Sequence, residues 1–531
     1  MKSFLLRFIT YTNQWVEKNW FLPFALFSLL YFLGAGGKAY SKAFWYDELF
    51  AWYIAQLPNF SDTWNAFAAG DLHPPLSHIL IRFSQFVFGE GELATRLPSI
   101  LGLWLGMLFL FLFIKRRYGS LIACQGILFL ALTPCYQYAF EARPYALIIA
   151  CCCLGLFCWQ LATEHICRKW AFFGLGFSLG AGLFLHFYAV LLFVPIVIGE
   201  LSRSFRSKSI DWPIWIAIAL GASLIIPLIP LIVKAKAYSD YYWAKPTLHR
   251  LATSIKWFLP FGISRGFYAS LFFLGVLRIW CISTHDNRRN STCLTLPSHE
   301  LIAALALMLL PCFGFLIAKF LTNAFTPRYF LAATVGIALV FSFLVYQVNF
   351  SAPWVSTVVI ITLLSLFIFR QAEDFRGLTG GKPGINKAGM QILSTTGDDP
   401  IVIADAHSFL EFSHYVPPSL KKRLFYLTNW NAAVRFTGSD TNDRGLSSLG
   451  KKVPLGVENY HSFLSSHERF YLFSPPCGKK RLYWVVPQLL EDGARFTGKR
   501  ERNGYLVQEV FINHAPSSVL KKPKIVSGLK E

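Results

Sequence analysis

Over its first 370 residues the chain repeats one pattern, a long apolar stretch followed by a short polar one. Eleven of the apolar stretches carry few charges and approach the ~20 residues that a helix needs to cross a bilayer. We predict helices at 20–36, 97–115, 120–138, 145–162, 170–186, 187–201, 212–233, 266–282, 301–320, 329–347 and 352–370. The pattern predicts an α-helical polytopic membrane protein with about 11 transmembrane helices.

Composition and charge agree with this prediction. The 531 residues are 54% hydrophobic and only 15% charged, whereas a soluble globular protein has about 25% charged residues. The formal net charge of +21 would suggest nucleic acid as the partner of a soluble protein. In a polytopic protein it indicates topology signals and contacts with anionic lipid instead. We therefore expect membrane lipids, and no nucleic acid, among the partners.

The basic residues also predict the orientation. The first helix follows basic residues, and no small-residue cleavage site follows it, so it is typical of a retained signal anchor with a cytoplasmic N-terminus. Alternate counting then brings the basic loops at 115–117, 168–169, 203–208 and 288–289 to the cytoplasmic side, as the positive-inside rule requires. The first loop, 38–96, and everything after residue 370 are predicted to lie outside.

After residue 370 the composition becomes that of an ordinary globular domain. Apolar runs at 401–404, 423–427, 470–473, 482–486 and 505–511 predict strands, and 408–415 predicts a helix. We predict a transmembrane domain at 1–370 and an extracytoplasmic α/β domain at 371–531. The basic end of the chain, from about residue 515, is expected to be disordered.

Two carboxylates in the first outer loop are candidates for chemistry. Asp47 and Glu48 follow Trp45 and Tyr46, and long ordered loops are usually functional. Partial desolvation beside a membrane would raise the basicity of a carboxylate. The alternative is that the two acids form a solvated face and the tryptophans an interfacial belt.

Four arginines, Arg96, Arg143, Arg265 and Arg328, are predicted to lie just before helices that start on the outer side. A helix N-terminus is partly positive, so a cation there needs an anion, and guanidinium groups at such ends suit phosphate. The alternatives are pairing with loop carboxylates such as Glu141, or snorkelling to headgroups. A lone histidine such as His186 is more often a hydrogen-bonded core residue than a ligand.

Six motifs in this order resemble those of the GT-C glycosyltransferases, most closely the bacterial branch of protein O-mannosyltransferase and aminoarabinose transferase type. They are Phe44-Trp45-Tyr46-Asp47-Glu48, Asp71-Leu72-His73-Pro74-Pro75-Leu76, Glu92-Leu93-Ala94-Thr95-Arg96-Leu97-Pro98-Ser99, Glu141-Ala142-Arg143-Pro144-Tyr145-Ala146-Leu147, His186-Phe187-Tyr188 and Pro327-Arg328-Tyr329-Phe330. The resemblance implies an enzyme of the bacterial inner membrane that takes a sugar from a polyprenyl-phosphate donor. It implies an acceptor on the outer side, which is a lipid, a cell-envelope glycan or a protein.

The resemblance also implies roles for individual residues. Asp47 matches the catalytic aspartate of the family, and Glu48 is its neighbour, which we include as a catalytic candidate. The predicted donor-phosphate site consists of Arg143, Arg328, His73, Arg96, Tyr145 and His186. In relatives the Asp71 and His73 segment lies near the phosphate and in some near a divalent metal. Many relatives have Lys before the two prolines, so metal dependence is left open.

This reading predicts a single displacement. Polyprenyl phosphate is a good leaving group, so one base for the acceptor hydroxyl and cations for the phosphate suffice, and the anomeric centre inverts. The alternatives are a protein O-mannosyltransferase specifically, or a transporter or flippase of lipid-linked sugars, for which polar groups at mid-span and matched broken helices are expected.

Overall fold

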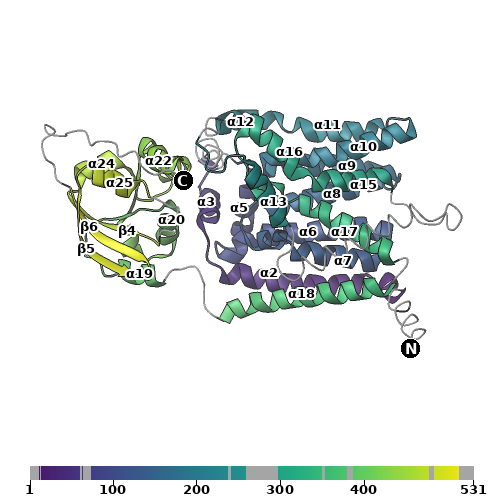
Figure 1. Cartoon of the computed structure of the whole chain (residues 1–531), viewed down its shortest axis with the longest axis horizontal. Helices are drawn as coiled ribbons and strands as arrows, with labels where there is room; N and C mark the ends of the chain where they lie inside the picture. Colours follow the sequence, from purple (N-terminus) through teal and green to yellow (C-terminus); the bar gives the residue numbers. More distant parts are fainter. Residues whose placement is uncertain are drawn as a thin grey trace. The chain divides into compact units, whose positions relative to one another are not determined.

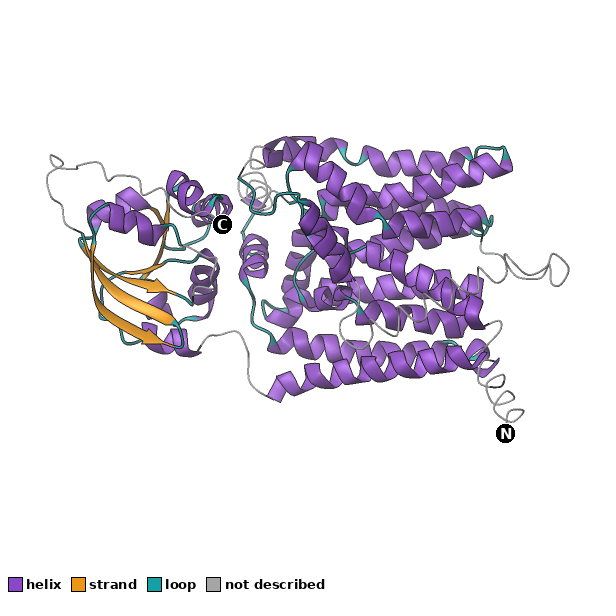
Figure 2. Cartoon of the chain, viewed as in Figure 1, coloured by secondary structure: helices purple, strands orange, loops and turns teal. Residues whose placement is uncertain are grey.

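The structure is a computed structural model. It describes residues 11, 14–59, 62–63, 73–236, 241–258, 297–349, 353–379, 387–476 and 483–512. The chain divides into two compact units, residues 1–385 with 451–453, and residues 386–450 with 454–531. Helices make up the first unit, and strands occur only in the second among the described residues (Figures 1 and 2).

The first unit is a bundle of long apolar helices (Figure 1). Its elements are α2 (Phe21–Ser41), α3 (Tyr46–Ala55), α5 (Leu76–Phe88), α6 (Glu92–Tyr118), α7 (Ser120–Leu132), η2 (Pro134–Phe140), α8 (Tyr145–Thr163), α9 (Arg168–Leu185), η3 (Phe187–Leu192), α10 (Phe193–Ser207), α11 (Trp212–Ser223), η4 (Ile226–Leu228), α12 (Ile229–Lys236), α13 (Leu248–Phe258), α15 (Ser298–Met308), α16 (Leu310–Ile317), η5 (Ala318–Thr322), η6 (Pro327–Phe330), α17 (Ala333–Asn349) and α18 (Pro353–Thr379). Side chains from most of them pack into one continuous apolar core that runs from α2 to α18, while α3 and α5 bury Ala51, Ala55 and Ile81 in a smaller separate cluster.

The predicted spans coincide with these helices wherever the structure describes them. Six described helices are long and apolar enough to cross a membrane, or up to eight if each of two bent pairs is one span. The predicted boundary near residue 186 is also found, since α9 ends at Leu185 and η3 begins at Phe187. The predicted span 266–282 lies outside the described residues, so the number eleven stays a prediction.

Two spans are bent rather than straight. The chain turns by 71° between Ser120–Leu132 and Pro134–Phe140, and by 52° between Ser298–Met308 and Leu310–Thr322. A proline, Pro134 or Pro311, lies at the start of each second segment. Proline lacks the N–H that would continue the preceding helix, which explains both bends. The first bend leads into the loop that carries Arg143, and the second leads through residues 323–326 into η6, which carries Arg328.

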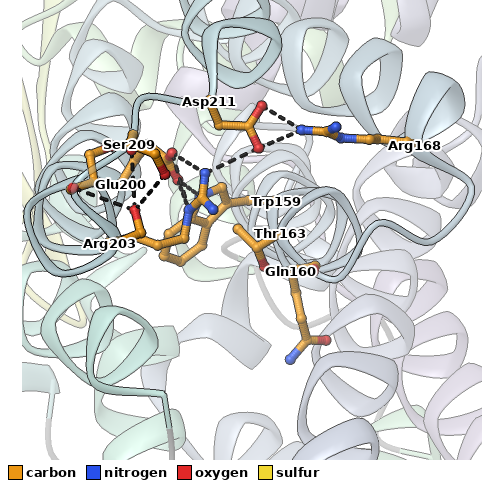
Figure 3. Close-up of polar contacts among 10 residues, drawn as sticks. Trp159, Gln160, Thr163, Arg168, Glu200, Arg203, Ser209 and Asp211 are labelled. Carbon is orange, nitrogen blue, oxygen red and sulfur yellow. Dashed lines mark hydrogen bonds and ion pairs between the residues drawn. The ribbon is translucent and has the colours of Figure 1, made fainter.

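Charged side chains join the helix ends at the side predicted to be cytoplasmic (Figure 3). Glu200, which is fully buried, accepts hydrogen bonds from the indole of Trp159 at 2.9 Å and from Arg203 at 2.6 Å. Arg203 also contacts Asp211 at 3.2 Å, and Arg168 pairs with the same carboxylate. The network therefore links α8, α9, α10 and the residue before α11.

A second charge cluster lies at the ends of α6, α8 and α15. Arg117 pairs with Glu164 at 2.6 Å and with Glu300, and Arg116 also pairs with Glu164. Basic residues from loops predicted to share one side of the membrane are thus close to one another. Carboxylates balance them, as buried or half-buried charges require.

The second unit is built on a six-stranded sheet in the order β3-β2-β1-β4-β6-β5. The strands are β1 (Ile401–Ile403), β2 (Leu424–Thr428), β3 (Val457–Asn459), β4 (Arg469–Ser474), β5 (Arg495–Arg502) and β6 (Tyr505–Phe511). The first four are parallel, and β6 pairs antiparallel with both β4 and β5. The predicted α/β fold class of this unit is therefore confirmed.

Helices pack against this sheet (Figure 2). They are α19 (Lys387–Leu393), α20 (Ala406–Tyr415), α21 (Pro418–Lys421), α22 (Trp430–Thr437), α23 (Thr441–Gly450), α24 (Tyr460–Ser466) and α25 (Val485–Glu491). The predicted strand at 482–486 is wrong, because α25 starts there and buries Val485 and Leu489, which are one helical turn apart. The predicted disorder from residue 515 lies outside the described residues.

Candidate active site

The first turn of α3 positions the two candidate carboxylates. Trp45 is extended, with φ −106° and ψ 174°, and helical geometry begins at Tyr46. Asp47 and Glu48 therefore lie in the first turn, where the partly positive helix end stabilises negative charge. Adjacent residues on a helix point about 100° apart. The two acids consequently enter different surroundings.

Glu48 forms a fully buried ion pair with Arg96. The Nε and Nη2 atoms of Arg96 donate to the two carboxylate oxygens of Glu48 at 2.7 Å each, and both side chains are 0% exposed. The backbone N–H of Ala142 donates to Glu48 Oε1 at 2.7 Å, and that of Trp45 to Oε2 at 3.4 Å. This arrangement leaves Glu48 no exposed oxygen with which to meet a substrate.

Arg96 is equally well satisfied by the backbone. Its guanidinium donates to the carbonyl oxygens of Ala39, Lys42 and Ala43 at 2.5–3.1 Å. The expectation that it precedes a helix is wrong, because α6 begins four residues earlier, at Glu92. The structure does not bring Arg96 to the other predicted phosphate-binding residues. The Glu48–Arg96 pair instead joins α2, α3, α6 and the loop before α8.

Asp47 contacts the two arginines predicted to hold phosphate. Its Oδ2 atom lies 3.0 Å from Nη1 of Arg328 and 3.3 Å from Nη2 of Arg143. The side chains of Asp47, Arg143 and Arg328 are 19%, 8% and 21% exposed. The two guanidinium carbons lie 5.7 and 5.9 Å from the ring centre of Tyr145. Three chain segments thus bring two cations and one anion together.

Aromatic rings connect this charge cluster to the predicted histidines. The ring of His186 lies 5.7 Å from that of Tyr145 and 4.7 Å from that of Tyr329. The ring of His73 lies 5.7 Å from that of His186. The predicted residues His73, Tyr145 and His186 therefore belong to the same neighbourhood as Arg143 and Arg328.

Three tyrosines of this neighbourhood, Tyr188, Tyr242 and Tyr329, were not predicted as site residues. The hydroxyl groups of Tyr242 and Tyr329 are 2.6 Å apart, and the ring of Tyr188 stacks on Tyr329 at 4.9 Å. Burial raises the pKa of Tyr242, so its hydroxyl stays protonated and can donate. For Tyr188 and Tyr329 the signal was present, since both belong to the motifs that carry the resemblance, whereas Tyr242 lies in none of the six motifs.

The carboxylate of Glu141 forms its ion pair with a lysine. It pairs with Lys42 at 3.2 Å, and burial raises the pKa of this carboxyl. The alternative was that loop carboxylates pair with the arginines. Asp47 and Glu48 are the carboxylates that do so. Asp71 and Arg265 lie outside the described residues. Within the described part of the chain no three His, Cys, Asp or Glu side chains are grouped as a metal site would require.

Fold and site together define a class, a polytopic membrane protein with the architecture of the GT-C glycosyltransferases. The family model of dolichyl-phosphate-mannose-protein mannosyltransferases matches residues 72–231. The predicted resemblance and fold class are therefore confirmed. No curated protein matches the sequence.

Solved structures show the same fold over nearly the whole chain. ArnT from Cupriavidus metallidurans in the apo state matches with a TM-score of 0.57 and 12% identity, over 93% of this chain and 98% of that one. ArnT from the same organism bound to undecaprenyl phosphate matches with a TM-score of 0.56 and 12% identity, over 92% of this chain and 98% of that one. The archaeal oligosaccharyltransferase AglB from Archaeoglobus fulgidus also matches, in a structure that contains an inhibitory peptide and a dolichol-phosphate. Its TM-score is 0.51 and its identity 12%, over 93% of this chain and 74% of that one.

Proposed function

We propose that the protein is an inverting glycosyltransferase that moves a sugar from a polyprenyl-phosphate donor to an acceptor on the outer side of a bacterial inner membrane. The observation that carries this proposal is the contact of Asp47 with both Arg143 and Arg328. A carboxylate able to accept a proton and two guanidinium groups able to bind phosphate lie at one place. Two structural neighbours bind a polyprenyl phosphate, ArnT undecaprenyl phosphate and AglB a dolichol-phosphate, which supports this donor class.

The charges fit a monophosphate-linked donor. Two arginines supply two positive charges, and Asp47 with a donor phosphodiester supplies two negative charges. When the acceptor hydroxyl attacks, its oxygen bonds to the anomeric carbon, and the bond from that carbon to the phosphate oxygen breaks. The proton moves to Asp47 while the electron pair remains on the phosphate, which becomes a monoester with up to two negative charges. The total charge of the site is the same before and after this step.

Each side chain then has a separate role in the proposal. Asp47 is the general base, a role that contributes roughly 10²–10⁴-fold in rate. Arg143 and Arg328 stabilise the departing phosphate. Glu48 and Arg96 are positioning residues that hold the start of α3 beside α6. His73, His186 and Tyr145 border the phosphate site.

A transporter or flippase of lipid-linked sugars remains the alternative from another class. Broken spans, which that alternative predicts, are present. However, each break here leads the chain into an arginine of the Asp47 site, through η2 to Arg143 and through η5 to Arg328. The bends thus serve to build the site, and this favours the enzyme. Protein O-mannosylation is the narrower alternative, and it concerns the acceptor.

A panel of radiolabelled polyprenyl-phosphate sugars, incubated with the purified protein and envelope extract, tests the proposal. We expect label to move from at least one donor to lipid, glycan or protein, and the Asp47→Asn variant to lose at least about 100-fold of this rate. Fractionation of the product identifies the acceptor class. Equal transfer by the wild type and the Asp47→Asn variant would refute the proposed base. Movement of intact donor across vesicles without transfer would favour the transporter.

A further inference from the structure

Asp47, the proposed base, contacts the two arginines that are proposed to bind the donor phosphate. Asp47 Oδ2 is 3.0 Å from Arg328 and 3.3 Å from Arg143, so one oxygen atom contacts both guanidinium groups. Arg143 is only 8% exposed. A buried guanidinium requires an anion beside it. Asp47 supplies that anion in this structure.

A donor phosphate that binds the same guanidinium atoms takes the place that Asp47 holds. We propose that Asp47 and the donor phosphate exchange on Arg143 and Arg328, so that donor binding itself releases the base for the acceptor. This inference rests on the proposed function and adds the regulation of the same site. It implies that the donor binds before the acceptor, because the carboxylate is engaged with the arginines until phosphate arrives.

The same exchange explains how the product lipid leaves. After transfer Asp47 holds the acceptor's proton and is neutral, while the polyprenyl phosphate carries up to two negative charges. Neutral Asp47 does not compete for the arginines, so they retain the phosphate. Once Asp47 gives its proton to water, its carboxylate returns to Arg143 and Arg328 and displaces the product.

The inference predicts that removal of the carboxylate tightens the binding of the lipid phosphate. The test measures the dissociation constant of undecaprenyl phosphate for the full-length protein in nanodiscs, by calorimetry, with undecaprenol as the uncharged control ligand. Charge-assisted hydrogen bonds correspond to roughly ten- to a hundred-fold in affinity. Since Asp47 and Arg328 are about one-fifth exposed, we expect the lower end, a roughly ten-fold tighter dissociation constant for Asp47→Asn.

Matched variants show whether a change in lipid-phosphate affinity comes from the exchange, from the loss of any nearby negative charge, or from misfolding. Glu141→Gln removes the same charge from the loop next to Arg143, but its carboxylate pairs with Lys42, so binding should change less than two-fold. Asp47→Glu keeps the charge and should bind as the wild type does. Asp47→Ser is a second removal variant should Asp47→Asn fail to fold, which a melting curve reveals.

The outcomes distinguish the inference from the proposed function. Tighter binding in Asp47→Asn or Asp47→Ser, without tighter binding in Glu141→Gln, supports exchange. Unchanged or weaker binding in the folded Asp47 variants overturns exchange, while loss of transfer in them would still support the base. An equal gain in Glu141→Gln also overturns exchange. If neither the wild type nor any variant binds undecaprenyl phosphate, the proposed donor class and the exchange both fail.

Discussion

The sharpest prediction concerns Glu48, for which the sequence and the structure suggest different roles. A Glu48→Gln substitution keeps the size of the side chain but removes its charge and turns one acceptor oxygen into an N–H₂ group. At the Oε2 position that group faces Nη2 of Arg96 and the N–H of Trp45, and at the Oε1 position it faces Nε of Arg96 and the N–H of Ala142, all of which are donors. At least one favourable contact becomes a contact between donors, and the charge of Arg96 loses its partner.

The magnitude follows from the burial of this pair. Breaking a buried ion pair by removing one partner costs roughly 3–5 kcal/mol. Arg96 keeps its three carbonyl acceptors, so we expect about 3 kcal/mol, the lower end of that range. At ~2 °C per kcal/mol, the melting temperature in detergent should fall by about 6 °C. The double variant Glu48→Gln/Arg96→Gln should recover about 1–2 kcal/mol, because it leaves no unpaired charge.

The assay compares melting and transfer. At a temperature where Glu48→Gln is folded, its kcat should fall far less than that of Asp47→Asn, and the double variant should regain stability. The reasoning would be refuted if Glu48→Gln melted like the wild type yet lost transfer as completely as Asp47→Asn. Glu48 would then act in the reaction despite its burial.

Three further predictions test other parts of the molecule. Arg328→Ala should weaken the binding of undecaprenyl phosphate about ten-fold, measured by calorimetry, and unchanged affinity in the folded variant would contradict the phosphate role. Glu200→Gln leaves Asp211 as the only carboxylate that pairs with Arg203 among the described residues, so it should lower the stability of the bundle by about 2 kcal/mol without changing lipid affinity. Burial raises the pKa of Asp443 to about 7. Because the unfolded value is near 4, the stability contributed by its proton is complete below about pH 4 and is lost as the pH rises to about 7. Hydrogen exchange of β2 amides in the full chain should show this loss, and Asp443→Asn should abolish it.

Much of the fold was predictable because its cause is local in the sequence. Apolar length and the alternation of basic loops predicted the helices, and the strands 401–404 and 505–511 were found from their apolar runs. The bends at Pro134 and Pro311 were missed, because a proline within an apolar stretch marks both kinked and straight spans. The wrong strand at 482–486 shows that a short apolar run fits a helix equally well.

The sequence predicted which residues belong to the candidate site, but not which of them form ion pairs with one another. Motifs pointed to Asp47, Glu48, Arg96, Arg143 and Arg328, and all five lie at one end of the bundle. The choice of partner depends on the direction in which each side chain leaves its helix, and that direction depends on where the helix begins. The start of α6 at Glu92 places Arg96 inside the helix, facing Glu48, which a sequence pattern cannot show.

A helix that begins at Tyr46 forces two adjacent carboxylates into different roles. Both benefit from the helix N-terminus, but they point about 100° apart, so one neighbour cannot serve both. Glu48 turns toward Arg96 and is sealed, which fixes the start of α3 against α6. Asp47 is thereby held toward Arg143 and Arg328 and keeps about one-fifth of its surface exposed. A base has to change its charge during the reaction, and only the carboxylate that retains access to substrate and water can do so at low cost. In the proposed reaction, the burial of Glu48 therefore leaves Asp47 as the member of the pair that can act as the base.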